Sequence, residues 1–122
     1  MNQMGEKSDT YKVVIQLSSN ELLVQKATIS QLNNILNALP SVSIELVMNG
    51  PGIDLILKDA FLINTLEQLS EKGIQFMVCK NSLNYKNMDH NSILPFCKIV
   101  PSALAHLVVR QHEGWSYIKA GF

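Results

Sequence analysis

Cys79 is the residue in this sequence whose type and position are best suited to chemistry. It ends the apolar run 74–79 (Ile-Gln-Phe-Met-Val-Cys) and directly precedes Lys80 and a predicted helix start. Helix N-termini carry unpaired N–H groups and about half a positive charge, which stabilise a thiolate and lower its pKa. A thiolate there would be a nucleophile, would be oxidisable, or would carry sulfane sulfur as a persulfide. The alternative is that Cys79 is a small apolar filler of the core, as free cysteines often are.

The second cysteine and the three histidines are weaker candidates. Cys97 stands at the start of a short predicted strand, and a disulfide with Cys79 would require their Cα atoms to lie within about 7 Å. His90 lies in a polar segment from which it could approach Cys79. His106 and His112 are six residues apart on one predicted helix and therefore point from different faces. Because the sequence also has no Cys-x-x-Cys pair, we expect no metal site.

Two loops at predicted strand ends lack the features of phosphate-binding loops. The segment 49–52 (Asn-Gly-Pro-Gly) offers backbone N–H groups to an anion but lacks the Lys-Ser/Thr ending of a P-loop. We interpret it as a structural turn that shapes the rim of the site. The segment 18–20 (Ser-Ser-Asn) contains no glycine and is short for a flavodoxin-type phosphate cradle. We therefore predict no FMN and no other cofactor.

Strands and helices are predicted to alternate along the chain. Runs of β-branched and apolar residues predict five strands, at residues 11–17, 42–48, 74–79, 97–100 and 115–119. Apolar stripes at three- and four-residue spacing, bounded by Gly and Pro, predict helices at about 20–39, 54–72, 81–86 and 101–113. This order predicts a three-layer α/β fold: a five-stranded, mainly parallel sheet with helices on both faces, flavodoxin-like. Residues 11–122 would form this single domain and residues 1–10 a flexible N-terminal tail.

The composition excludes several classes of function. Ten Lys and Arg balance ten Asp and Glu, and a net charge of zero argues against nucleic acid as a partner. No apolar run approaches the roughly 20 residues of a membrane span, and the polar residues 1–10 do not resemble a signal peptide. We therefore expect a cytoplasmic protein with reduced thiols. The 47% of apolar and only 16% of charged residues hint that part of the surface is buried against other copies.

Three segments, taken in order, resemble the DsrE/DsrF-like family, which includes YchN-type and TusD-type sulfur-relay proteins. Residues 45–53 are similar to the family's apolar strand running into a Gly-Pro-Gly turn. Residues 73–83 are similar to its strand ending in Cys-x-Asn-Thr-Leu. Residues 100–118 are similar to its Pro-Ser-Gly helix start, followed by Gln-x-Glu-Gly-Trp-x-Tyr-Ile. The resemblance covers about residues 11–121.

The resemblance implies a five-stranded parallel α/β domain that assembles into trimers or hexamers. In sulfur-relay members, the cysteine at the position of Cys79 accepts sulfur as a persulfide and passes it on. The sequence departs from the family pattern at three positions. Asn49 stands where many relatives have His, Ala103 where the helix start usually has Gly, and Ser82 where Thr is usual.

Two hypotheses of different classes follow. The first is a sulfur carrier or low-turnover sulfurtransferase that holds a persulfide on Cys79, between donor and acceptor proteins of an intracellular relay. The other residues expected to form its site are Asn49, Gly50, Gly52, Lys80, Asn81, Ser82 and Ser102, with the N–H groups of Lys80 and Asn81 stabilising negative charge. The second is a non-catalytic oligomeric binding module, a homotrimer or hexamer, in which Cys79 is inert. Its strand-end pocket would hold a small anion or a partner's tail.

Overall fold

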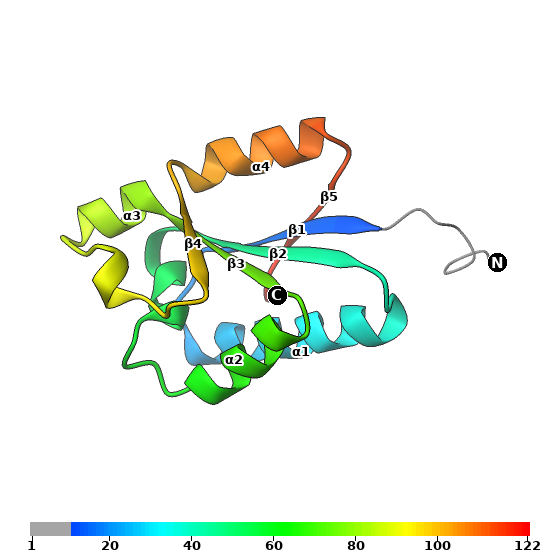
Figure 1. Cartoon of the computed structure of the whole chain (residues 1–122), viewed down its shortest axis with the longest axis horizontal. Coiled ribbons are helices and arrows are strands. Elements are labelled where there is room, and N and C mark those ends of the chain that lie inside the picture. Colours follow the sequence, from blue (N-terminus) through cyan, green and yellow to red (C-terminus); the bar gives the residue numbers. More distant parts are fainter. Residues whose placement is uncertain (1–10) are drawn as a thin grey trace.

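Five parallel strands form a single sheet in the order β4-β3-β2-β1-β5 (Figure 1). The computed structural model describes residues 11–122, so the tail predicted at 1–10 lies outside the described residues. The strands are β1 (Lys12–Leu17), β2 (Ser43–Met48), β3 (Gln75–Cys79), β4 (Cys97–Val100) and β5 (Ser116–Lys119). All five predicted strands are confirmed to within a residue of their expected bounds.

Four α-helices and two 3₁₀ segments connect the strands. They are α1 (Leu22–Ala38), η1 (Gly50–Ile56), α2 (Ile63–Glu71), α3 (Lys80–Tyr85), η2 (His90–Ser92) and α4 (Ala103–His112). Helices α1 and α2 cover one face of the sheet and α4 lies on the other, while α3 continues beyond the carboxyl end of β3 (Figure 1). The predicted three-layer α/β architecture is thus confirmed, although the strand order differs from the 2-1-3-4-5 order of flavodoxin. Among the described helices, none combines the length and apolarity that crossing a bilayer requires.

The helix predicted at 54–72 is shorter than its apolar stripe indicated. Its first part is η1 and a turn, and α2 begins only at Ile63. The reason is that backbone groups of this stretch bond elsewhere: Lys58 N–H donates to Ser92 O at 3.1 Å, and Ile56 O accepts from Leu94 N–H at 2.9 Å. Long-range pairing with residues 92–94 replaces the hydrogen bonds that a continuous helix would form.

The core consists of two layers of unequal size. The larger one packs the α1 and α2 side of the sheet and includes Phe76, whose ring meets Phe96 edge-on at 5.4 Å. The smaller one lies beneath α4, whereas Leu83 of α3 belongs to the larger one. The smaller layer is composed of Val14, Val47, Met77, Cys79, Val100, Ala103 and Leu107, with Trp115 at its edge. Because side chains alternate along each strand, Cys79 faces this smaller layer, as Met77 does.

The carboxyl ends of β3 and β4 form the switch point of the sheet. The connection after β3, with Leu83 of α3, packs on the same side as α2, whereas the chain leaves β4 into α4 on the other face. Parallel α/β sheets bind ligands where neighbouring connections diverge in this way. Met48 pairs with Val78, so the next residues, Asn49 and Cys79, lie side by side at this edge. The fold therefore places the predicted site at the expected end of the sheet.

Candidate functional site

The thiol of Cys79 lies where two helices begin. Cys79 ends β3 and immediately precedes α3. It also pairs with Val100 of β4, three residues before the start of α4. This register brings the N–H of Ala103, the first residue of α4, to within 3.3 Å of Cys79 Sγ, to which it donates. The sulfur thus accepts a hydrogen bond from a helix other than the one that follows it in sequence.

Neutral donors make this site favourable for a thiolate. Burial raises the pKa of the Cys79 thiol, but hydrogen bonds from Ala103 N–H, the Ser82 hydroxyl and the N–H groups of Ser82 and Asn81 outweigh it. The net result is a pKa below the ordinary value of a cysteine. The largest lowering contribution comes from Ala103, which the sequence singled out only as a departure from the usual glycine of the helix start. Lys80 has an exposed side chain at the first position of α3.

The Gly50 turn orients one of these donors. Gly50 adopts a left-handed conformation with φ of 55°, which glycine tolerates better than other residues. Its N–H donates to Ser82 Oγ at 2.8 Å. A hydroxyl that accepts one hydrogen bond keeps its own hydrogen to donate, and the Ser82 hydroxyl is among the groups that lower the pKa of the Cys79 thiol. Gly50 and Ser82, two of the residues expected at the site, are thus joined by a hydrogen bond.

Gly52 and Ser102 have identifiable structural roles. A Cβ on Gly52 would lie 2.0 Å from the carbonyl oxygen of Leu17, so this position lets the turn pack against the end of β1. Ser102 caps α4, its hydroxyl accepting from Ala105 N–H at 3.2 Å. By fixing the first turn of α4, Ser102 helps to place the Ala103 N–H. Asn49 Oδ1 accepts from Gln16 Nε2 at 3.0 Å, beside Cys79 at the edge of the sheet.

Access to the thiol is narrower than the sulfur-transfer hypothesis requires. Cys79 is only 5% exposed, and its neighbours in the smaller core layer are largely aliphatic. A cavity of about 330 Å³ lies beside it, lined by Gly50, Pro51, Asn81, Ser82, Tyr85 and Lys86. Asn81 and Ser82 line the cavity and also lower the pKa of the Cys79 thiol. The thiol is therefore one side chain away from an opening rather than freely exposed.

An ion pair at the rim of this cavity was not anticipated from the sequence. Lys86 Nζ lies 2.6 Å from Asp54 Oδ1, and Asn20 Nδ2 donates to Asp54 Oδ2 at 3.0 Å. Burial raises the pKa of Asp54, but the hydrogen bonds from Lys86 and Asn20 lower it by more, so the pKa lies below its ordinary value. The three residues come from three separate loops or helices. Spacing in the sequence could not indicate that they meet.

Cys97 and His90 lie apart from the Cys79 thiol. Cys97 pairs with Phe76, three residues before Cys79 along β3, and belongs to the larger core layer on the other face of the sheet. Three residues of strand span about 10 Å, beyond the reach of a disulfide, and both cysteines are free. Burial raises the pKa of Cys97 to about 12. His90 is exposed and lines a separate cavity together with Cys97. Within residues 11–122, no group of three His, Cys, Asp or Glu side chains could hold a metal ion.

The protein is a three-layer α/β protein with a five-stranded parallel sheet and a hydrogen-bonded thiol at the carboxyl edge of that sheet. The family model of the DsrE/DsrF-like family matches residues 12–120, and the chain belongs to that family. The structure superimposes on a protein of unknown function, MTH1491 from Methanobacterium thermoautotrophicum, with a TM-score of 0.87. The two chains are 31% identical over 89% of this chain and 98% of the other.

Two more distant structures share the fold. The YchN protein from E. coli is 11% identical, with a TM-score of 0.76 over 90% of this chain and 99% of its own. BT1422 from Bacteroides thetaiotaomicron, a conserved protein of unknown function, is 12% identical, with a TM-score of 0.69 over 88% of this chain and 93% of its own. A comparison with proteins of curated function gave no match.

Proposed function

We propose that this protein is a sulfur carrier, or a low-turnover sulfurtransferase, that holds a persulfide on Cys79 in a cytoplasmic sulfur relay. The observation that carries the proposal is the hydrogen bond from Ala103 N–H of α4 to the Cys79 sulfur at 3.3 Å, at the start of α3, where the pKa of the thiol is lowered despite its burial. Membership of a family of sulfur-relay type supports it. Asn49, Gly50, Asn81 and Ser82 form the surroundings of the reacting sulfur in this proposal.

The transfer needs no oxidant and no cofactor. The Cys79 thiolate attacks the outer sulfur of a donor persulfide, a new S–S bond forms, and the donor's S–S bond breaks as its thiolate leaves. In the second step an acceptor thiolate attacks the outer sulfur on Cys79, and the Cys79 thiolate leaves. The N–H of Ala103 and the Ser82 hydroxyl stabilise the negative charge on Cys79 before the first step and again as it leaves in the second.

Donor and acceptor must reach the sulfur from the cavity beside Ser82. In this proposal a rotation of the Ser82 side chain opens the path between the cavity and Sγ. The rim is suited to a partner's surface, because Tyr85 is 90% exposed and Lys86 presents a cation held by Asp54. Exposed aromatic residues are favoured at protein interfaces. We therefore place the docking of sulfur donor and acceptor proteins at this rim.

We further propose that the chain assembles with itself into a homotrimer or hexamer. The outward side of α4 exposes Leu104, Val108 and Val109, and β5 exposes Ile118. Apolar patches of this kind mark association surfaces in soluble proteins. Light scattering is expected to give a mass of three or six chains for the wild type. Leu104→Glu should lower that mass, while Leu23→Glu, at a leucine of α1 that is at least as exposed, should leave it unchanged.

The direct test of sulfur carriage is the intact mass after incubation with a persulfide donor. The reduced wild type should gain ~32 Da, the mass of one sulfur atom, and release it to dithiothreitol. Cys97→Ser should gain the same mass, because its thiol lies on the other face of the sheet. Cys79→Ser should gain none. Absence of the adduct in the wild type, or its persistence in Cys79→Ser, contradicts the proposal.

One observation favours the second candidate, a non-catalytic binding module: Cys79 is only 5% exposed. A module of this kind would use the cavity lined by Asn81, Tyr85 and Lys86 for an anion or a partner's tail, with the thiol inert. The rate of Cys79 alkylation at neutral pH separates the two. An inert thiol reacts no faster in the native protein than in the denatured chain, whereas an activated, accessible one reacts faster.

A further inference from the structure

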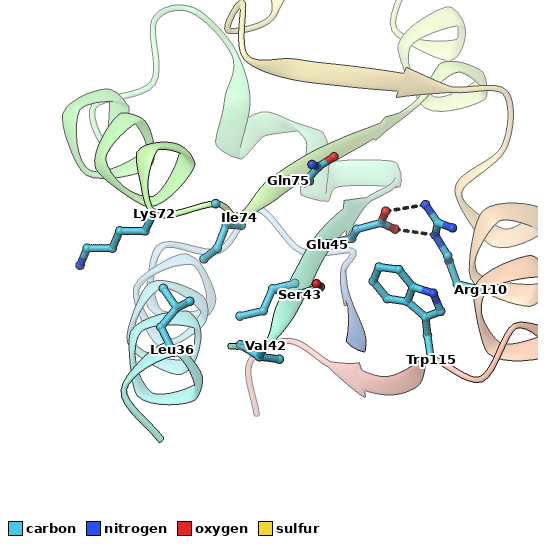
Figure 2. Close-up of a pocket in the computed structure, with 11 residues that line it drawn as sticks. Leu36, Val42, Ser43, Glu45, Lys72, Ile74, Gln75, Arg110 and Trp115 are labelled. Carbon is cyan, nitrogen blue, oxygen red and sulfur yellow. Dashed lines mark hydrogen bonds and ion pairs between the residues drawn. The ribbon is translucent and has the colours of Figure 1, made fainter. Parts of the chain in front are cut away.

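A buried carboxylate ties α4 to the sheet at the end opposite the thiol. Glu45 of β2 is 4% exposed and points toward α4 (Figure 2). Arg110 binds it with both branches of its guanidinium, Nε to Oε1 at 3.1 Å and Nη2 to Oε2 at 2.8 Å. His106 Nε2 lies 2.7 Å from the same Oε1. The Arg110 guanidinium also stacks over the Trp115 ring at 4.6 Å, next to Glu45 in Figure 2.

The cluster is held together by the hydrogen bonds and ion pairs that Glu45 makes. Burial raises the pKa of Glu45, but the hydrogen bonds and charges of Arg110 and His106 lower it by more, so the carboxylate is held in its charged form. A buried carboxylate that loses such partners is strongly destabilised. Its neighbours on the adjacent strands, Val14 of β1 and Gln75 of β3, carry no charge. The restraint therefore acts between β2 and α4.

Helix α4 depends on this restraint because its apolar anchorage is small. Only Ala103 and Leu107 of its ten residues are buried. Ala103, His106, Leu107 and Arg110 recur at the spacing of one helical face. Two of these four contacts are apolar and two are made to Glu45. The first residue of the same face is the one whose N–H donates to Cys79 Sγ.

We propose that Glu45 is a positioning residue for the Cys79 thiolate: by holding His106 and Arg110, it fixes α4 so that the Ala103 N–H stays in hydrogen-bond reach of the sulfur. The inference deepens the proposed function, since it rests on Cys79 as the reactive group. In this proposal, Glu45 contacts α4 at His106 and Arg110 but acts on the thiol through Ala103, the first residue of α4. Glu45 touches neither the sulfur nor the cavity beside it.

The sign of the effect separates positioning from simple electrostatics. Glu45→Gln removes a negative charge and leaves the charge of Arg110 without its buried counterion. Both changes act through space to favour a thiolate and would lower the thiol pKa. Loss of the restraint on α4 instead weakens the Ala103 hydrogen bond and raises the pKa. We expect a rise of about one pKa unit, less than the loss of a whole hydrogen bond to a charged group would cause.

The experiment is an ultraviolet titration of the Cys79 thiolate in the full chain, with Cys79→Ser as the blank. Readings up to about pH 9 stay below the titration of tyrosine. Cys97 does not interfere, because its pKa is raised to about 12. The titration reports the thiol directly and needs no sulfur donor. A wild type that fails to take up sulfur therefore refutes the proposed function but leaves this inference open to its own test.

Two further variants control the comparison. Arg110→Lys conserves every charge but loses the two-branched grip on Glu45, and it should also raise the thiol pKa. Glu113→Gln removes the exposed carboxylate that Arg110 Nη1 binds at 2.9 Å, with the same change in net charge, and should not raise it. The inference is overturned if Glu45→Gln lowers the thiol pKa or leaves it unchanged. If Glu45→Gln does not fold, an unchanged pKa in Arg110→Lys overturns it equally.

Discussion

Replacing Ser82 with Ala tests the chemical core of the site by removing one donor from the Cys79 sulfur. The Ser82 hydroxyl accepts from Gly50 N–H at 2.8 Å and lowers the pKa of Cys79. Alanine occupies the same helical position without the hydroxyl, and the N–H groups of Ala103 and Asn81 stay in place. We therefore predict that Ser82→Ala raises the pKa of the thiol while α3 remains folded.

The size of the rise follows from the strength of one hydrogen bond. A bond to a charged group contributes about 1.5–3 kcal/mol, and sulfur is a weak acceptor, so the lower end applies. One pKa unit corresponds to 1.36 kcal/mol, which gives a rise of about one unit. Well below the pKa, the thiolate fraction then falls about tenfold. The more basic thiolate is about threefold more nucleophilic, so the net loss of rate is about threefold.

The assay is the rate of alkylation as a function of pH, measured in a Cys97→Ser background. Ser82→Ala should move the midpoint of the profile upward by about one unit and raise its plateau about threefold. Ser82→Thr, which keeps the hydroxyl and matches the residue usual in the family, should retain the wild-type midpoint. A midpoint that stays in place in Ser82→Ala would refute the reasoning, because it would show that the hydroxyl does not stabilise the thiolate.

Three further predictions concern stability and selectivity. Folding lowers the pKa of Cys79, so between the folded and unfolded pKa values the unfolded chain binds more protons than the folded one. The free energy of unfolding should therefore rise with pH in that window, by at most about 1.4 kcal/mol per pH unit. Denaturant titrations at several pH values should show this rise in the wild type and a flatter profile in Cys79→Ser. Gly52→Ala should lower the free energy of unfolding by about 3 kcal/mol or more, because its Cβ would clash with the Leu17 carbonyl. Gly50→Ala has open space for a Cβ but a φ of 55°, and it should lower the free energy of unfolding by about 1–2 kcal/mol. Thermal melts of the two variants test this order. Limited alkylation at neutral pH followed by peptide mapping should label Cys79 before Cys97, whose pKa of about 12 leaves almost no thiolate; equal labelling would contradict the assigned difference.

The fold was largely predictable because its periodicities are local. The run from Phe76 to Cys79 reads as a buried strand, and it is one. The error at 54–62 arose where hydrogen bonds to residues 92–94 outweigh helical periodicity. No local pattern in the sequence reports such a partner. The same limit applies to the strand order, which depends on which edge of the sheet β5 joins.

The site was predictable in its side chains but not in its main donor. The position of Cys79 before a helix start pointed to the N–H groups of Lys80 and Asn81 and to Ser82 as a site residue. Asn81 and Ser82 lower the thiol pKa, whereas Lys80 is not among the groups that do. Ala103 could not be identified in the same way, since every residue except proline carries an N–H and only the pairing of Cys79 with Val100 selects this one. The role of Glu45 is hidden for a similar reason. A lone acidic residue in an apolar strand is visible in the sequence, but its partners on α4 lie 61 and 65 residues away.

A comparison of the two cysteines speaks against an inert, space-filling role for Cys79. At Cys97 burial acts on the thiol without opposing hydrogen bonds, and the pKa rises to about 12. At Cys79 burial acts in the same direction, yet donors from α3 and α4 reverse the result. An apolar filler gains little from such donors, because a neutral thiol accepts hydrogen bonds only weakly. Backbone N–H groups directed at a sulfur become strongly favourable only when that sulfur carries negative charge. The geometry around Cys79 is therefore better matched to a thiolate than to a thiol, and a thiolate is the form that sulfur transfer requires.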